Sequence, residues 1–136
     1  MRPFVDTNVL VYANDPADKG KQRIARETLR AHAEDLVLSA QVLSELFVVL
    51  TRPLGLAMGI EDARAIVQEL RRFPVVPVDE LLVLDAIEVS TQARISHWDG
   101  LIIAAARAGG CDSVLTEDLA PDAVIAGVRI ENPFAT

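Results

Sequence analysis

Apolar residues follow two different spacings along this 136-residue chain. Short apolar runs predict strands at residues 4–5, 36–38, 75–78, 113–115 and 128–130. Between them, apolar residues recur every three or four positions, which predicts helices at residues 19–34, 40–51, 61–72, 79–94 and 98–108. Such alternation is typical of parallel sheets covered by helices. We predict a single α/β domain over residues 1–136, with a parallel sheet of four to five strands flanked by helices on both faces.

The composition fits one globular domain of this kind. Aromatic residues make up only 4% of the chain, so any aromatic platform for stacking nucleic-acid bases must be small. The single cysteine, Cys111, excludes an internal disulfide and fits a reducing compartment. The first residues do not form a signal-peptide pattern, and no apolar run approaches the ~20 residues that span a bilayer. We therefore expect a cytoplasmic protein without a membrane partner.

The charge balance bears on nucleic acids as partners. The chain has 13 Lys and Arg residues against 20 Asp and Glu residues, a formal net charge of −7. Phosphate binding normally uses a basic surface, so this total argues against a nucleic-acid partner. The objection weakens if several acids gather around a metal ion. The positions of the acids therefore decide the question.

Acidic residues directly follow two of the predicted strands. Asp6 comes after the first strand, and Glu117 and Asp118 come after the fourth, preceded by Thr116. Ligand sites in parallel sheets form beyond the carboxyl ends of the strands, so we expect these acids to lie together. Taken alone, Asp6 is explained equally well as a turn former or the cap of a following helix.

Glu45 lies in a helix that is apolar almost all the way round. That pattern predicts burial of the helix, and a buried carboxylate costs several kcal/mol unless it is paired or bound to metal. No Lys or Arg occurs between Arg30 and Arg52 to pair with it. Glu45 either reaches solvent or a distant arginine, or it is a metal ligand, and we favour the ligand.

Asp99 has a simple structural explanation. Ser96 and Asp99 have the spacing of a capping box, and an acid in the first turn also suits the helix dipole. Local sequence therefore favours capping, and Asp99 becomes a candidate ligand only together with the other three acids. Four carboxylates in one cleft would repel, and a hard divalent cation such as Mg²⁺ or Mn²⁺ removes that repulsion. Such a site activates water and stabilises charge on a phosphodiester.

These acids lie in motifs that resemble the PIN-domain nucleases, particularly the VapC toxins of bacterial toxin–antitoxin pairs. The resemblance covers nearly the whole chain, in the family's order. Its pieces are DTNVL at residues 6–10, SEL at 44–46, WD at 98–99 with AAA at 104–106, LTEDL at 115–119 and VRIENPF at 128–134. Each piece is short, but the ordered set is specific.

The resemblance implies a metal-dependent endoribonuclease with a PIN-like fold. A metal-activated water would hydrolyse RNA and leave 5′-phosphate and 3′-hydroxyl ends. One or two Mg²⁺ or Mn²⁺ ions would be held by Asp6, Glu45, Asp99 and Asp118. Groups that orient these ligands or waters would be Thr7, Asn8, Thr116 and Glu117. Glu117 also competes with Asp118 as the fourth ligand, and we favour Asp118 because it stands where the motif expects it.

The resemblance also implies protein partners. These are a second copy of the chain, forming a homodimer, and a cognate VapB-like antitoxin. The C-terminal segment of such an antitoxin typically wraps the toxin and blocks its site. Its basic residues would be attracted to the carboxylates, and its apolar anchors would use a groove between helices.

Two further features allow a functional and an ordinary interpretation. A basic helix face could hold RNA phosphates, but an ordinary solvated face explains it as well; its residues are Lys19, Arg23, Arg26 and Arg30. Trp98 could stack a base, although a lone tryptophan more often packs in a core or a dimer interface. We assign no role to His97 or Cys111.

Two other functions compete with the nuclease. A phosphatase or phosphotransferase with Asp6 as nucleophile would need a second acid at Asn8 and a late lysine, and the only lysines are Lys19 and Lys21. A catalytically inactive PIN-like module that binds RNA or protein would lack a ligand, whereas all four candidate positions hold acids. We therefore predict a Mg²⁺- or Mn²⁺-dependent endoribonuclease, the toxin of a toxin–antitoxin pair.

Overall fold

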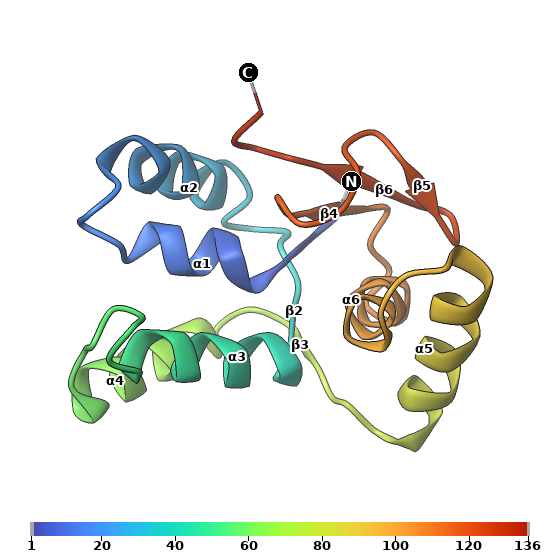
Figure 1. Ribbon diagram of the computed structural model, residues 1–136, viewed down its shortest axis with the longest axis horizontal. Helices are drawn as coiled ribbons and strands as arrows, with labels where there is room; N and C mark the ends of the chain where they lie inside the picture. Colours follow the sequence, from blue (N-terminus) through green and yellow to red (C-terminus); the bar gives the residue numbers. More distant parts are fainter. Residues whose placement is uncertain (1, 136) are drawn as a thin grey trace.

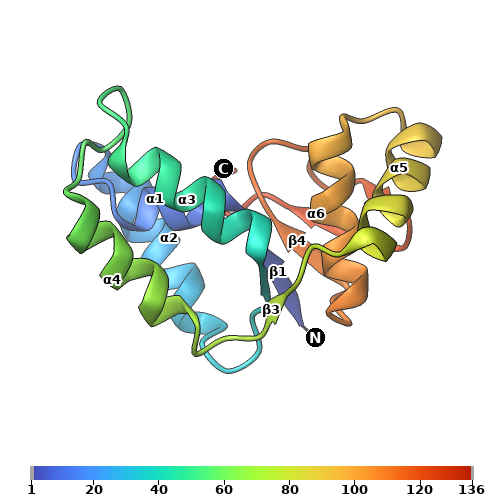
Figure 2. The same cartoon turned by 90° about the horizontal axis from the view of Figure 1, so that it is seen from below.

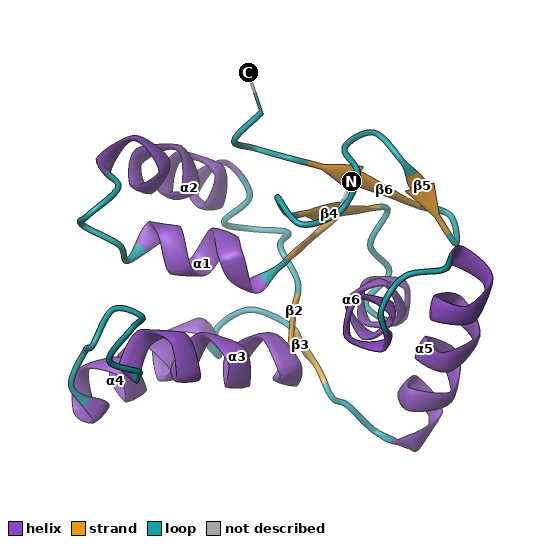
Figure 3. Cartoon of the chain, viewed as in Figure 1, coloured by secondary structure: helices purple, strands orange, loops and turns teal. Residues whose placement is uncertain are grey.

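A computed structural model describes residues 2–135, so Met1 and Thr136 of the predicted domain lie outside the described residues. As predicted, helices separate the strands along most of the chain (Figures 1 and 3). Two helices lie between each of the first four strands and the next, and the last three strands follow one another at the end of the chain. In chain order the elements are β1 (Pro3–Val5), α1 (Thr7–Ala13), α2 (Lys19–Ala31), β2 (Leu38–Ser39), α3 (Ala40–Thr51), α4 (Ile60–Leu70), β3 (Val75–Val76), α5 (Glu80–Ala93), α6 (His97–Ala108), β4 (Ser113–Leu115), β5 (Val124–Ile125) and β6 (Val128–Glu131).

β1 lies at the centre of the strands. It pairs in parallel with β4, and β4 pairs in parallel with β6. On its other side, Val5 N donates to Val37 O at 3.0 Å and Val37 N donates to Pro3 O at 3.0 Å. This bridge joins β1 to the parallel pair of β2 and β3. The mostly parallel arrangement is confirmed, with the difference that two small sheets meet at one bridge.

β5 departs from the predicted parallel arrangement. It pairs antiparallel with β6 across a two-residue turn. The turn residues, Ala126 and Gly127, have positive φ angles of 50° and 83°. Consecutive positive φ angles give the twist of a hairpin turn, for which Asn-Gly or Asp-Gly is the usual signal. In the Ala126-Gly127 turn only the glycine is typical of such a turn, so the sequence pattern does not predict this hairpin.

α1 is a second element that the apolar pattern did not predict. Its sequence is rich in β-branched residues, which have low helix propensity. It forms because Asp6 caps its first turn and because Val9 and Leu10 are buried in the core. Tertiary packing and a cap therefore decide this helix rather than its own propensity.

α6 is the most deeply covered part of the core. Every residue from Gly100 to Ala106 is buried, and α5 packs along it (Figure 2). A Cβ atom added at Gly100 would lie 2.7 Å from the Ala86 carbonyl oxygen and 2.9 Å from the Ser90 Cβ. Gly100 therefore permits the close approach of these two helices.

The helices flank the strands from two sides. In both views α1 to α4 gather on one side of the strands, and α5 and α6 on the other (Figures 1 and 2). Within residues 2–135, no helix combines the length and the apolar character needed to cross a bilayer.

Candidate active site

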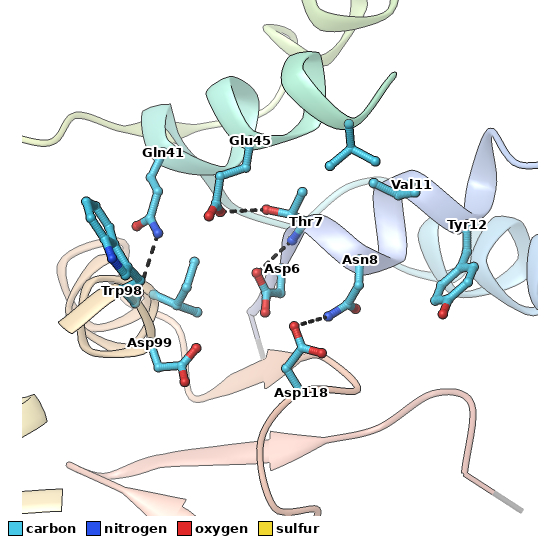
Figure 4. A pocket seen from close by; sticks show the side chains of 12 residues that line it. Asp6, Thr7, Asn8, Val11, Tyr12, Gln41, Glu45, Trp98, Asp99 and Asp118 are labelled. Atoms are coloured by element: carbon cyan, nitrogen blue, oxygen red, sulfur yellow. Dashed lines mark hydrogen bonds between the residues drawn. The ribbon is translucent and has the colours of Figure 1, made fainter. Parts of the chain in front are cut away.

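A cavity of about 340 Å³ opens where β1 and β4 end, between α1, α3 and α6. Figure 4 shows the carboxylates of all four predicted acids, Asp6, Glu45, Asp99 and Asp118, facing this space. None of the described residues that line it is a lysine, an arginine or a histidine. The lining residues are Asp6, Thr7, Asn8, Val11, Tyr12, Gln41, Glu45, Val49, Trp98, Asp99, Ile102 and Asp118. Residues from separate segments of the chain thus form one acidic pocket.

Asp6 lies at the floor of the cavity and is only 6% exposed. Its Oδ1 accepts a hydrogen bond from the Thr7 backbone N–H at 2.7 Å, which caps α1. Its Oδ2 accepts from the Thr116 hydroxyl at 2.8 Å. Asp6 therefore has both of the roles considered for it, because the same carboxylate caps α1 and faces the pocket.

The negative charge at Asp6 is poorly compensated. Burial raises the pKa of Asp6 from 3.8 to about 6, against the hydrogen bonds from Thr116 and Thr7, which lower it. The charges of Asp118 and Glu45 also contribute to this rise, but less than burial does. The raised pKa is therefore mainly an effect of burial, to which the neighbouring carboxylates add.

The raised pKa predicts how stability depends on pH. In the unfolded chain Asp6 titrates near 3.8, so the folded state binds the proton more tightly and is favoured as pH falls through about 6. Above that pH the buried charge opposes folding, and the shift corresponds to about 3 kcal/mol. We expect the metal-free protein, in chelator, to gain stability to urea between about pH 7.5 and about pH 5.

The matched variant for this titration is Asp6→Asn, which cannot ionise. Its advantage over the wild-type protein in free energy of unfolding should be largest at about pH 7.5 and should shrink towards about pH 5. A difference that stays constant over this range would contradict the assignment of the titration to Asp6.

Glu45 reaches the pocket from α3, where its Oε1 accepts a hydrogen bond from the Thr7 hydroxyl at 2.9 Å. The prediction that Glu45 is buried was wrong. α3 buries only Val42, Leu46 and Leu50 and leaves its other sides to solvent and to the cavity. An apolar residue on an exposed side, such as Val48 at 54% exposure, makes the sequence look buried all round.

Thr116 links the polar residues that follow β1 to Asp118, which follows β4. Its hydroxyl accepts from the Asn8 amide at 3.1 Å and from the Asp118 backbone N–H at 3.0 Å, while donating to Asp6. The Asn8 amide also donates to Asp118 Oδ2 at 3.0 Å. Three polar residues predicted to orient the acids, Thr7, Asn8 and Thr116, therefore each contact at least one of them.

Glu117 points away from the pocket. It accepts hydrogen bonds from the Tyr12 hydroxyl at 2.6 Å and from Lys21 Nζ at 2.8 Å. Burial alone would raise the pKa of Glu117, but the bonds from Lys21 and Tyr12 outweigh it and lower that pKa. Phe134 packs edge-on against Tyr12, with ring centroids 5.0 Å apart. Glu117 is thus committed to this cluster, and the acid that lines the pocket is Asp118.

Asp99 stands in the first turn of α6. Its backbone N–H donates to the Ser96 hydroxyl oxygen at 3.0 Å, which is one half of the predicted capping box. The other half is missing: among the described residues the Asp99 carboxylate makes no bond back to Ser96. It faces the cavity instead (Figure 4).

The basic face of α2 lies outside the acidic pocket. Lys19, Arg23, Arg26 and Arg30 line a separate groove along the helix. Arg26 also donates from Nε to the Ala13 carbonyl at 2.8 Å and so ties α2 to α1.

Sequence reasoning missed two polar lining residues, Tyr12 and Gln41. Both carry a readable signal, because Tyr12 follows Asn8 by four positions and Gln41 precedes Glu45 by four. Residues four apart share a helix face, so each should point where its neighbour points.

The donor set fits a hard divalent cation. Four carboxylates offer only oxygen ligands, and the lining residues supply no positive charge to neutralise them. In the described rotamers, no three acidic, histidine or cysteine side chains stand at metal-ligand spacing. Glu45 is an exposed side chain that can rotate towards Asp6 without breaking the core. The pocket therefore has the right chemistry for a cation, with ligands that would have to draw together around it.

The chain matches known proteins in sequence pattern and in fold. Residues 4–125 match the PIN domain family model. No curated protein sequence matches the chain. Among solved structures, a toxin–antitoxin complex from Klebsiella pneumoniae superposes with a TM-score of 0.75 at 16% identity, covering 98% of this chain and 99% of that chain.

Two further solved structures are similar at low identity. DNA-bound VapBC from Salmonella typhimurium has a TM-score of 0.71 at 22% identity, covering 98% of both chains. VapC20 from Mycobacterium tuberculosis, a toxin that cleaves the sarcin–ricin loop, has a TM-score of 0.66 at 21% identity, covering 82% of this chain and 86% of that chain. At such identities the likeness shows a shared fold.

Proposed function

Because this chain belongs to the PIN-domain family, we propose that it is a Mg²⁺- or Mn²⁺-dependent endoribonuclease and the toxin of a toxin–antitoxin pair. One observation carries the proposal: four carboxylates from distant parts of the chain face one cavity that no basic side chain of the described residues lines. Asp6, the buried member of this cluster, opposes folding when it is ionised, and a bound cation would offset that cost. The cluster therefore points to a function that needs the cation.

The ligands of one or two Mg²⁺ or Mn²⁺ ions would be Asp6 and Asp99, completed by Glu45 and Asp118. A bound ion of this kind activates a water molecule and neutralises charge on the phosphodiester during in-line displacement. Hydrolysis would leave 5′-phosphate and 3′-hydroxyl ends, as the family resemblance implies.

The other pocket residues would hold the ligands in place. Thr116 and the Thr7 backbone N–H fix both oxygens of Asp6, and the Thr7 hydroxyl holds Glu45. The Asn8 amide does the same for Asp118. Losing such an orienting bond typically reduces metal affinity or activity about 10- to 100-fold.

The decisive experiment is cleavage of single-stranded RNA by the purified chain with and without divalent cations. We expect no cleavage in chelator and full recovery on addition of Mg²⁺ or Mn²⁺. We expect Asp118→Asn to reduce the rate by about 10²-fold. Cleavage that persists in chelator would refute the metal-dependent mechanism.

Glu117→Gln is the matched control for this experiment. It makes the same acid-to-amide change one residue away from Asp118, in a side chain that faces Tyr12 and Lys21 instead of the pocket. Its cleavage rate should stay within about threefold of the wild-type rate, because this half-buried side chain does not line the pocket and its amide oxygen can still accept hydrogen bonds from Tyr12 and Lys21. A loss as large as that of Asp118→Asn would mean that Glu117 is the fourth ligand.

The competing enzyme function is poorly supported. Asn8 stands where a nucleophilic aspartate of this kind would need a second acid, and no lysine is among the described residues that line the pocket. The inactive binding module would lack an acid, and all four acids line the pocket.

We propose a VapB-like antitoxin as the protein partner, acting on a homodimer of the chain in the cytoplasm. The similar solved structures include toxin–antitoxin complexes, which supports this class of partner. Basic side chains of such a partner would be complementary to the acidic pocket. Expression of the chain alone should arrest growth, and co-expression with a neighbouring small open reading frame should relieve the arrest.

The basic groove of α2 is the candidate contact for RNA phosphates. We expect the double charge reversal of Arg23→Glu and Arg30→Glu to weaken RNA binding and to lower the salt dependence by about one or two phosphate contacts. Arg26 is left unchanged because it ties α2 to α1. Arg107→Glu, at an exposed arginine in the last turn of α6, is the control. If the double variant and the wild-type protein bound RNA equally at low salt, α2 would not contact the RNA.

A further inference from the structure

We propose that Trp98 and Gln41 form a subsite for one unstacked nucleobase of single-stranded RNA, beside the phosphodiester that is cleaved. This inference, which rests on the nuclease function proposed above, identifies the part of the substrate that the pocket recognises. It is carried by two observations at the same end of the cavity, an exposed indole and an amide with an unused hydrogen-bonding atom.

Trp98 is the only tryptophan of the chain, and 66% of it is exposed. It lines the cavity at the start of α6, directly before Asp99 (Figure 4). The His97 ring meets it edge-on, with ring centroids 5.6 Å apart. An exposed indole is costly in water and is a good surface for a base, since stacking on an aromatic side chain contributes about 1–3 kcal/mol per base.

Gln41 lies across the cavity from α6, on the same face of α3 as Glu45. Its Nε2 donates to the Trp98 carbonyl at 3.4 Å, a long bond, and its buried Oε1 has no hydrogen-bond partner among residues 2–135. A buried polar atom without a partner is unfavourable. The side chain therefore loses little by rotating to meet a ligand that offers both a donor and an acceptor.

A nucleobase edge offers such a pair. An amide presents one acceptor and one donor side by side, and this pattern matches the edge of a base such as adenine. With the base face on Trp98 and its edge on Gln41, both features are used by one ligand. Protein side chains that read single-stranded RNA use this combination of stacking and edge contacts.

The electrostatics of the cavity favour a base over a phosphate at this position. Four carboxylates repel phosphate groups wherever a cation does not intervene, whereas a nucleobase is uncharged. Trp98 is adjacent in sequence to the proposed ligand Asp99, so the bound base belongs to a nucleotide next to the cleaved bond. Bases stacked in a duplex cannot offer a free face, so the subsite selects single strands and loops.

The sole tryptophan makes the subsite directly measurable. A short unstructured RNA labelled with fluorescein is titrated into the full-length Asp6→Asn chain, which should bind without cutting. Binding is followed by anisotropy of the label and, in parallel with unlabelled RNA, by Trp98 emission. We expect Trp98 emission to be quenched with the same midpoint as the anisotropy change.

The variants separate stacking from general binding. In the Asp6→Asn background, Trp98→Leu should bind about 5- to 50-fold more weakly and Trp98→Phe should bind nearly as tightly, because Phe keeps a ring. Gln41→Ala should change the preference among the four bases more than the affinity for any mixture of them. An RNA of abasic nucleotides should bind the Trp98→Leu variant and its parent equally weakly.

Three results would overturn the subsite. The first is tight RNA binding with unchanged Trp98 emission, and the second is equal binding by the Trp98→Leu variant. The third is emission that depends on protein concentration and not on RNA, which would place Trp98 in a contact between two copies of the chain. A protein that binds RNA but never cleaves it would refute the nuclease while leaving these binding results interpretable.

Discussion

Asp6→Asn is expected to reduce RNA cleavage by at least about 10³-fold while making the metal-free protein more stable at about pH 7.5. The loss of rate would follow because the proposed cation supplies several kcal/mol of transition-state stabilisation and Asp6 is the most buried of its proposed ligands. The gain in stability follows because the amide removes a buried charge whose pKa is raised to about 6. A structural residue would lose stability and activity together.

The expected gain is about 2 kcal/mol. The pKa shift alone corresponds to about 3 kcal/mol, and the Asp6→Asn side chain would lose one hydrogen bond, because its amide nitrogen cannot accept from the Thr116 hydroxyl. Urea unfolding in chelator and single-turnover cleavage in Mg²⁺ measure the two effects. Asp112→Asn, at an exposed aspartate outside the pocket, should change neither. Wild-type rates in the Asp6→Asn protein would refute the assignment of Asp6 as a ligand.

Gly100→Ala is expected to destabilise the protein by about 1 kcal/mol net and to lower cleavage with it. The added methyl group would lie 2.7 Å from the Ala86 carbonyl oxygen, and this backbone atom cannot move unless α5 shifts. Overpacking of this kind costs about 1–3 kcal/mol, which exceeds the gain of about 1 kcal/mol in helix propensity. Because Asp99 precedes Gly100, a displacement of α6 also moves a proposed ligand.

Gly20→Ala is the matched control for this prediction. Gly20 lies in α2, and the nearest atom to an added Cβ is 3.8 Å away, at the Asp18 carboxylate. The variant should therefore gain stability through helix propensity, by about 0.5–1 kcal/mol. If the two variants changed the free energy of unfolding alike, close packing at Gly100 would not be the cause.

The sequence predicts the fold correctly where residue patterns within a segment agree with the general rules for parallel sheets. Asp6 and Asp118 were placed together because neighbouring parallel strands end at the same edge of a sheet, and β1 and β4 are such neighbours. α3 was predicted with the bounds that it has, because Ser39 caps it and a proline follows Arg52.

The exposure of Glu45 and the contacts of Glu117 could not be predicted from the sequence, for physical reasons. The burial of Glu45 was wrong, because apolar residues on a helix do not reveal whether another part of the same chain covers them. The position of Glu45 at the pocket followed only from its motif. The commitment of Glu117 to Tyr12 and Lys21 depends on contacts between residues about a hundred positions apart, which no local pattern encodes.

The central place of β1 has a consequence for when the protein can become active. The segment before α5 supplies two of the acids, Asp6 and Glu45, and the segment after it supplies Asp99 and Asp118. These two halves are joined where β1 pairs with β4. For the nuclease proposed above, a growing chain therefore cannot assemble all four acids until β4 and Asp118 have been synthesised. We expect a chain divided between β3 and α5 to give two fragments that do not cleave RNA separately and that cleave it only when they reassemble.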